Sequence, residues 1–162
     1  MFENGLAYRS NPGDRELNEK VIVIMMNIVM NTNSIPIVQE LFKYLHGLYI
    51  QYSKKAIADK QIVLDEILGL SHTCLLAIGG TAIPKPEFKD MVFYLIDEHI
   101  KHYGIETEVI NLISAAASCY KKDFRVRMDQ LWSHILMGLE MVDQKILFKA
   151  TLSCLSDIAR NH

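Results

Sequence analysis

A pattern of four apolar positions that recurs along the chain is the strongest constraint on its fold. Four segments rich in small and apolar residues each carry apolar side chains at i, i+3, i+7 and i+8, the spacing of one helix face. The matching positions are Val21, Ile24, Ile28 and Val29, then Ile67, Leu70, Cys74 and Leu75, then Val109, Leu112, Ala116 and Ala117, then Leu147, Ala150, Cys154 and Leu155. Successive sets lie 46, 42 and 38 residues apart. The spacing predicts a helical unit that repeats about every 42 residues.

Helices of a second kind, each with a single apolar face, alternate with these segments. We predict them over 37–53, 87–102 and 128–140, and the small-residue helices over 14–31, 63–78, 106–120 and 144–160. Helix breakers fall between them, at Pro12-Gly13, 33–36, Gly79-Gly80, 84–86, Gly104 and the charged stretch 121–127. Because no connection is long enough to cross a bundle, consecutive helices are expected to be neighbours in space.

A repeat of this length that carries two antiparallel helices is typical of HEAT and armadillo proteins, whose units bury their apolar faces by stacking on one another. We therefore predict an all-α, right-handed superhelix of about three and a half repeats and seven main helices. The half repeat covers 14–31, and the repeats cover 35–79, 86–121 and 127–161. Both terminal helices should expose apolar faces. A compact seven-helix bundle is the alternative.

Composition excludes several classes of protein. The 162 residues are 50% hydrophobic with 8 Gly and 4 Pro, which favours one folded domain over a disordered chain. The net charge of −2 and the lack of clustered Lys and Arg argue against nucleic-acid binding. The longest aliphatic run, 21–30, is too short to cross a bilayer, so no membrane is expected. Three cysteines, an odd number, fall within apolar runs and are expected to be buried free thiols of a reducing compartment, the cytosol or nucleus.

Three blocks of the chain resemble one family. LWSHILMGLEMVDQKILFKATLSCLSDIARN (131–161) resembles a HEAT repeat of importin-β, the karyopherin nuclear transport receptor, including Gly138-Leu139 at the close of the outer helix and Asp157 late in the inner one. IETEVINLISAAASCYKKDF (105–124) resembles the preceding inner helix, and GDRELNEKVIVIMMNIVMNTNSIPIVQE (13–40) is similar to an earlier repeat.

The resemblance implies a segment from the middle of a longer superhelix that carries cargo into the nucleus through the nuclear pore. Its partners would be cargo or an importin-α-like adaptor, the Ran GTPase and Phe-Gly nucleoporins, in the cytoplasm, the nucleus and the pore. In this family the second helix of each repeat faces the concave side, where adaptor and Ran bind, and nucleoporins insert between the outer helices. A scaffold of a phosphatase or translation complex is an alternative, and so is a small helical enzyme.

Motifs that could support catalysis or metal binding are weak in this sequence. His99 and His102 have a spacing that could serve a metal, but His99 falls on the apolar stripe of its helix, so we expect a packed side chain. Gly79-Gly80 ends a helix rather than opening a phosphate loop. No histidine stands at helical spacing from the cysteines. We therefore expect no enzyme, no cofactor and no metal site.

Acidic residues gather at the starts of the small-residue helices: Asp14, Glu16, Glu19, Asp65, Glu66, Glu106, Glu108 and Asp143. Complementarity to the helix dipole is one explanation. The other is a negative rim along the concave surface that would bind a basic partner. On the second view Glu66, Glu106, Glu108 and Asp143 are candidate protein-binding residues.

Apolar residues off the main stripes are the second set of candidates. Ile50 and Met137 lie roughly opposite the buried faces of their helices, and Phe93 widens the apolar surface of its helix beyond one contact face. These three are candidate contacts for an apolar partner segment. Trp132 falls within the apolar stripe and is expected to belong to the core.

Overall fold

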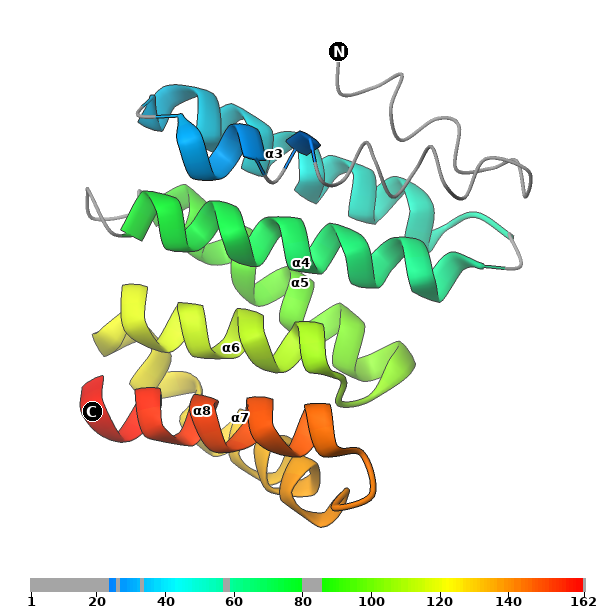
Figure 1. Ribbon diagram of the computed structural model, residues 1–162, viewed down its shortest axis with the longest axis vertical. Helices are drawn as coiled ribbons and strands as arrows, with labels where there is room; N and C mark the ends of the chain where they lie inside the picture. Colours follow the sequence, from blue (N-terminus) through cyan, green and yellow to red (C-terminus); the bar gives the residue numbers. More distant parts are fainter. Residues whose placement is uncertain (1–23, 26, 33, 57–58, 80–85, 162) are drawn as a thin grey trace.

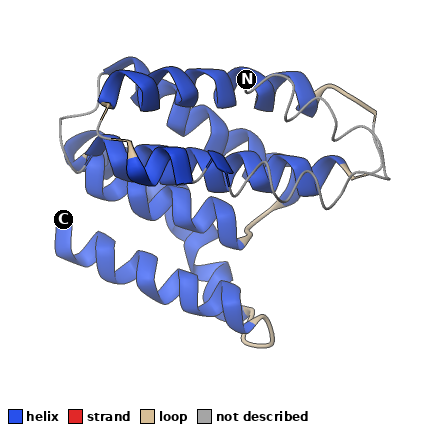
Figure 2. Cartoon of the chain, turned by 45° about the horizontal axis from the view of Figure 1, so that its top comes forward, coloured by secondary structure: helices blue, strands red, loops and turns tan. Residues whose placement is uncertain are grey.

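The computed structural model describes residues 24–25, 27–32, 34–56, 59–79 and 86–161. Their regular structure is entirely helical (Figure 2). The helices are α3 (Ile35–Ser53), α4 (Lys60–Gly79), α5 (Pro86–Tyr103), α6 (Thr107–Cys119), α7 (Lys121–Glu140) and α8 (Lys145–Asn161). Residues 24–31 are also helical wherever they are described. The all-α prediction is confirmed, while the start of the first predicted helix, with Asp14, Glu16 and Glu19, lies outside the described residues.

The helices stack in the order of the sequence. Helices α4, α6 and α8 lie side by side in one layer, with extensive contacts from α4 to α6 and from α6 to α8 (Figure 1). Helix α3 packs along α4, and α5 and α7 lie behind the layer, where α5 contacts α3 and α6 and α7 contacts α6 and α8. The described part of the first helix and α8 lie at opposite ends of the stack. These two helices therefore do not close a bundle by packing on each other.

Side-chain contacts within the layer join residues about one repeat apart. The Gln61 amide donates a hydrogen bond to Glu106, 45 positions later, across α4 and α6. Between α6 and α8, the Ser114 hydroxyl donates to Asp157 at 2.5 Å and the Asn161 amide donates to Ser118 at 3.3 Å, each pair separated by 43 positions. These separations are 3 to 5 positions longer than the 42 and 38 residues between the corresponding apolar sets, so α4, α6 and α8 lie side by side with a similar but not identical offset.

The recurring apolar positions form the core of this layer. All four positions of the α4 set and all four of the α6 set are buried. In the last set Leu147 and Cys154 are buried, whereas Ala150 and Leu155 are half-buried. Burial thus declines at the end of the stack, where a helix has a neighbour on one side. Cys74 and Cys154 are buried free thiols as predicted, and Cys119 is a half-buried one.

The charged stretch 121–127 is not a break, and this prediction is wrong. Helix α7 begins at Lys121, and its first turns are amphipathic rather than irregular. Phe124 is fully buried and stacks on Phe93 of α5, with ring centroids 6.5 Å apart. The charged side chains around it point to solvent, so they form the exposed face of a helix. The connection between α6 and α7 is therefore a single residue, Tyr120.

Trp132 is not a core residue, although its place in the apolar stripe predicted one. Its side chain is 42% exposed, and Leu136 and Met137 on the same helix are also exposed. The buried face of α7 runs through Phe124, Leu131, Ile135 and Gly138. Helix α7 is the last of its layer, so the rest of its apolar surface has no helix to cover it.

Large exposed apolar residues are unevenly distributed. Seven of the twelve in the described residues belong to α7, α8 and their connection, and none belongs to α5 or α6. Both terminal helices were predicted to expose apolar faces, and exposed apolar side chains are found on α8 (Ile146 and Leu152) and on the described part of the first helix (Ile24 and Met30). Helix α4 is also long and apolar enough to cross a membrane, but half of its apolar window is buried, and the core helix of a folded domain has the same composition.

Candidate functional site

Four carboxylates from two helices line one concave surface. Asp65 and Glu66 of α4 and Glu106 and Glu108 at the start of α6 border two adjoining grooves of about 320 and 300 Å³. We call these four residues and the grooves between them the acidic groove. Among the described residues that line it there is no Lys or Arg. The predicted binding residues Glu66, Glu106 and Glu108 therefore all line these adjoining grooves.

The helix dipole does not account for two of these acids, Asp65 and Glu66. Helix α4 begins at Lys60, which places Asp65 and Glu66 in its second turn, beyond the reach of the terminal dipole. Glu106 occupies the N-cap of α6, but its side chain makes no capping hydrogen bond. Only Glu108 lies in a first turn. The position of the acidic groove therefore needs another explanation.

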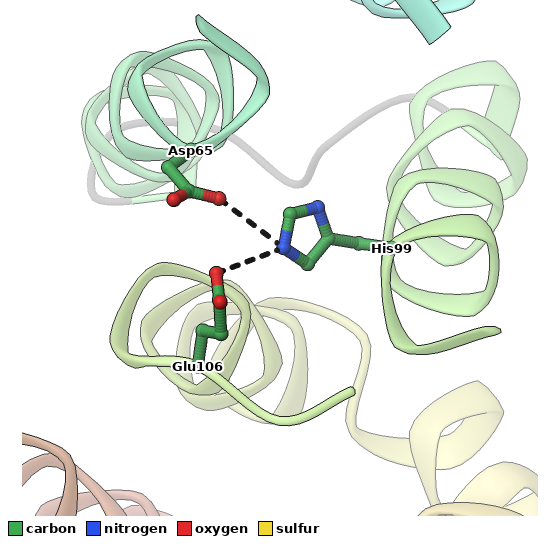
Figure 3. Close-up of side chains that lie close together, drawn as sticks. All are labelled: Asp65, His99 and Glu106. Atoms are coloured by element: carbon green, nitrogen blue, oxygen red, sulfur yellow. Dashed lines mark hydrogen bonds and ion pairs between the residues drawn. The ribbon is translucent and has the colours of Figure 1, made fainter. Parts of the chain in front are cut away.

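His99 of α5 lies beside two of the carboxylates of the acidic groove, Asp65 and Glu106. Its side chain is fully buried, and its Nε2 faces Asp65 Oδ1 at 3.3 Å and Glu106 Oε2 at 3.4 Å (Figure 3). The other ring nitrogen, Nδ1, is hydrogen-bonded to the buried Tyr49 hydroxyl at 3.1 Å. Three helices thus meet at one imidazole, and α3 supports it from behind. The prediction that His99 is packed rather than exposed is confirmed.

A tight connection brings Glu106 back to His99. Gly104 has φ +80°, in the region that favours glycine, and its N–H donates to the Ile100 carbonyl at the end of α5. Helix α6 starts at Thr107, so only three residues join the two helices. This sharp turn places a residue seven positions after His99 beside its ring.

Carboxylates outnumber basic side chains among the described residues that line the acidic groove. Burial, followed by the nearby Asp65 carboxylate, raises the pKa values of both Glu106 and Glu108. Burial lowers the pKa of His72, which lines the same surface, so this imidazole is not a source of positive charge at neutral pH. An ammonium, a guanidinium or a metal cation would each be attracted to such a site.

The remaining acidic candidate lies beside the groove rather than in it. Asp143 is exposed in the connection between α7 and α8, next to Gln144, which lines the groove. His102 is separate from His99 in the structure: it is exposed and contacts Glu98 at 3.4 Å on its own helix. The two histidines therefore do not share a metal site.

The apolar candidates are not brought together. Phe93 is buried beneath Arg127, whose guanidinium carbon lies 4.8 Å from the ring centroid. Ile50 is half-buried, and Met137 is 45% exposed. Only Phe93 lines the groove of about 510 Å³ between α5 and α7, and this groove is bordered by two ion pairs, Lys89 with Asp123 and Arg127 with Asp97. No open apolar groove links the three residues.

Comparison with known proteins finds no family model, no curated protein and no solved structure that matches the chain. The resemblance to importin-β therefore stays a prediction from the sequence. The geometry of the acidic groove is the firmest guide to function.

Proposed function

We propose that this chain is a protein-binding scaffold of stacked helical repeats that holds a basic segment of a partner in the acidic groove. The observation that carries the proposal is that Asp65, Glu66, Glu106 and Glu108 line two adjoining grooves whose described lining residues include no Lys or Arg. The proposed role is binding and includes no chemical step.

The charge of the groove suits an extended basic segment. Carboxylates on adjacent helices are spaced along the layer, and Asp143 extends the negative surface toward α8. Lys and Arg side chains of a partner would find carboxylates and, among the described lining residues, no competing Lys or Arg. Carboxylate–guanidinium pairs add geometric selectivity because the two groups match as bidentate partners. Raised pKa values of Glu106 and Glu108 are consistent with a site built for such a cation.

In its more specific form, the proposal is a right-handed superhelix of HEAT type that belongs to an importin-β-like receptor of the cytoplasm and nucleus. Two observations support it: the repeat spacing with its contacts about one period apart, and the placement of the acidic groove on the layer that the resemblance assigns to the concave side. The basic segment would then belong to cargo, to an importin-α-like adaptor or to Ran. A phosphatase or translation scaffold would use the same groove for a different partner.

Binding of Phe-Gly segments between outer helices receives less support. Phe93 is covered by Arg127, and two ion pairs border the groove between α5 and α7. A phenylalanine side chain would have to displace these polar contacts. We therefore place the partner at the acidic groove.

A peptide titration tests the proposal. A fluorescent Lys/Arg-rich peptide and a Phe-Gly peptide are titrated with the full chain in EDTA at 0.1 and 0.5 M salt. The Debye length falls from about 10 Å at 0.1 M to about 3 Å at 1 M, so binding to carboxylates weakens as salt rises, whereas apolar insertion responds little. We expect a basic-peptide Kd on the order of 10⁻⁴ M at low salt and a loss of affinity of about tenfold at high salt, about 1.4 kcal/mol.

The matched variants carry the same change of charge at two places. Glu66→Gln with Glu108→Gln alters the acidic groove, while Asp129→Asn with Glu140→Gln alters exposed acids of α7. We expect the first pair alone to weaken the basic peptide. Two results would contradict the proposal. The first is equal affinity of the two double variants for the basic peptide. The second is tighter binding of the Phe-Gly peptide than of the basic peptide, with an affinity that does not change with salt.

A further inference from the structure

We propose that Asp65, His99 and Glu106 form a Zn²⁺ site that joins α4, α5 and α6. This inference goes beyond partner binding and does not depend on it. The three residues offer one ligand atom each, all within 4.8 Å of one another (Figure 3). An imidazole with carboxylates is a donor set that Zn²⁺ uses in proteins.

The distances fit ligand atoms around a metal better than a tight hydrogen bond. His99 Nε2 lies 3.3 Å from Asp65 Oδ1 and 3.4 Å from Glu106 Oε2. Charge-assisted N–H to carboxylate hydrogen bonds are shorter, about 2.7–2.9 Å. Tetrahedral Zn²⁺ with bonds of about 2.0–2.1 Å places neighbouring ligand atoms about 3.3–3.4 Å apart. The ligand atoms of Asp65 and Glu106 lie within 4.8 Å of each other, so metal binding would draw the two carboxylates together.

Surrounding residues hold the donors in place. The buried Tyr49 hydroxyl contacts His99 Nδ1 at 3.1 Å, which fixes the ring with Nε2 aimed at both carboxylates. A metal-bound histidine characteristically uses its second nitrogen in this way. The Gln61 amide donates to Glu106 Oε1, leaving Oε2 on the side of His99.

The charge and access of the site also favour a cation. Among the described residues, His99 is the only basic side chain ion-paired with Asp65 or Glu106. The third carboxylate, Glu108, lines the same groove. That groove opens to solvent, so a metal could enter, and three protein donors leave a fourth position for water. The fully buried imidazole beneath two carboxylates distinguishes this place from an ordinary acidic surface.

Metal titration of the full chain tests the proposal. After treatment with EDTA and buffer exchange, the chain is titrated with ZnCl₂ by calorimetry and its thermal midpoint is recorded with and without metal. We expect one Zn²⁺ per chain. With free Zn²⁺ a hundredfold above Kd, the midpoint should rise by about 5–10 °C for a domain of this size. Co²⁺ bound at the same place should give a visible absorption band that Zn²⁺ removes.

Variants separate this site from other acids and histidines. Asp65→Asn and Glu106→Gln keep the shapes of the side chains and remove one ligand each, so each should weaken Zn²⁺ binding at least about tenfold, as even loss of a supporting residue typically does. The control, Glu98→Gln with His102→Gln, removes a half-buried carboxylate and its exposed histidine partner from the same helix and should leave Zn²⁺ binding unchanged. Calorimetry reports on binding even if a variant is less stable.

Three results would overturn the inference. The first is a wild-type chain that does not bind Zn²⁺. The second is binding that survives both single substitutions. The third is a response to Mg²⁺ as large as the response to Zn²⁺, which would indicate a general attraction of cations to the acidic groove. Because the peptide titration is done in EDTA, failure of the metal site and failure of partner binding are distinguishable.

Discussion

At the scale of single residues, Glu108 separates the two explanations for acids at helix starts. It lies in the first turn of α6, where the helix dipole stabilises a carboxylate. Its carboxylate also lies in the acidic groove, where burial and then Asp65 raise its pKa. The dipole makes ionised Glu108 stabilising, whereas the groove makes it destabilising.

Substitution of Glu108 by Gln therefore has a predicted sign. A raised pKa means that the folded chain binds this proton more tightly than the unfolded chain, so Glu108 lowers stability as pH rises above the ordinary carboxyl pKa of about 4.3. We expect Glu108→Gln to raise the free energy of unfolding at pH 7 by less than about 1 kcal/mol, since solvent screens the half-buried group. At pH 4 the gain should nearly vanish. Urea unfolding in EDTA at both pH values measures it, and a loss of stability at pH 7 would favour the dipole.

At the scale of helices, we predict that contacts between neighbouring helices contribute much of the stability. Leu112 of α6 is fully buried in the layer between α4 and α8, as its place in the recurring pattern predicted. Leu112→Ala should cost about 2–5 kcal/mol through lost burial and a cavity. Leu152→Ala on α8, where the side chain is 48% exposed, is the control and should cost far less. Denaturant unfolding of both variants measures the two losses of unfolding free energy. Equal losses would show that the buried positions of the helices are assigned wrongly.

The helices could be predicted from sequence because their apolar spacing is local information. The predicted range 37–53 corresponds to α3 and 87–102 to α5, each within two residues at its ends. Two predictions were wrong because they depended on packing between helices. The charged start of α7 is helical because Phe124 packs on Phe93. Trp132 is exposed because no helix covers it. Whether an apolar stripe is buried is decided by tertiary packing, which periodicity does not report.

The candidate site was predictable only in part, for the same reason. The acids stood out because they recur at equivalent places in the repeat. Asp65 and Glu106, however, meet at His99 only after α4, α5 and α6 pack together, and no sequence motif spans three helices. The one local signal was Glu106 seven residues after a histidine on an apolar stripe, across a glycine that permits a sharp turn.

At the scale of the whole molecule, the stack separates the proposed binding surface from the other surfaces. The layer of α4, α6 and α8 buries its recurring apolar positions and presents the acidic groove at one end of α4 and α6. The opposite layer uses ion pairs and aromatic stacking to join α5 to α7. The two layers therefore differ in chemistry, and we propose that the partner binds to the layer of α4, α6 and α8.

A map of the bound peptide on the chain tests this assignment most directly. At 18.5 kDa the chain suits amide nuclear magnetic resonance, and a Lys/Arg-rich peptide can be titrated in EDTA at 0.1 M salt. We expect the largest chemical-shift changes at Asp65, Glu66, Glu106, Glu108 and Gln144. Changes centred on Phe93 and Arg127, or the absence of any saturable change, would contradict it.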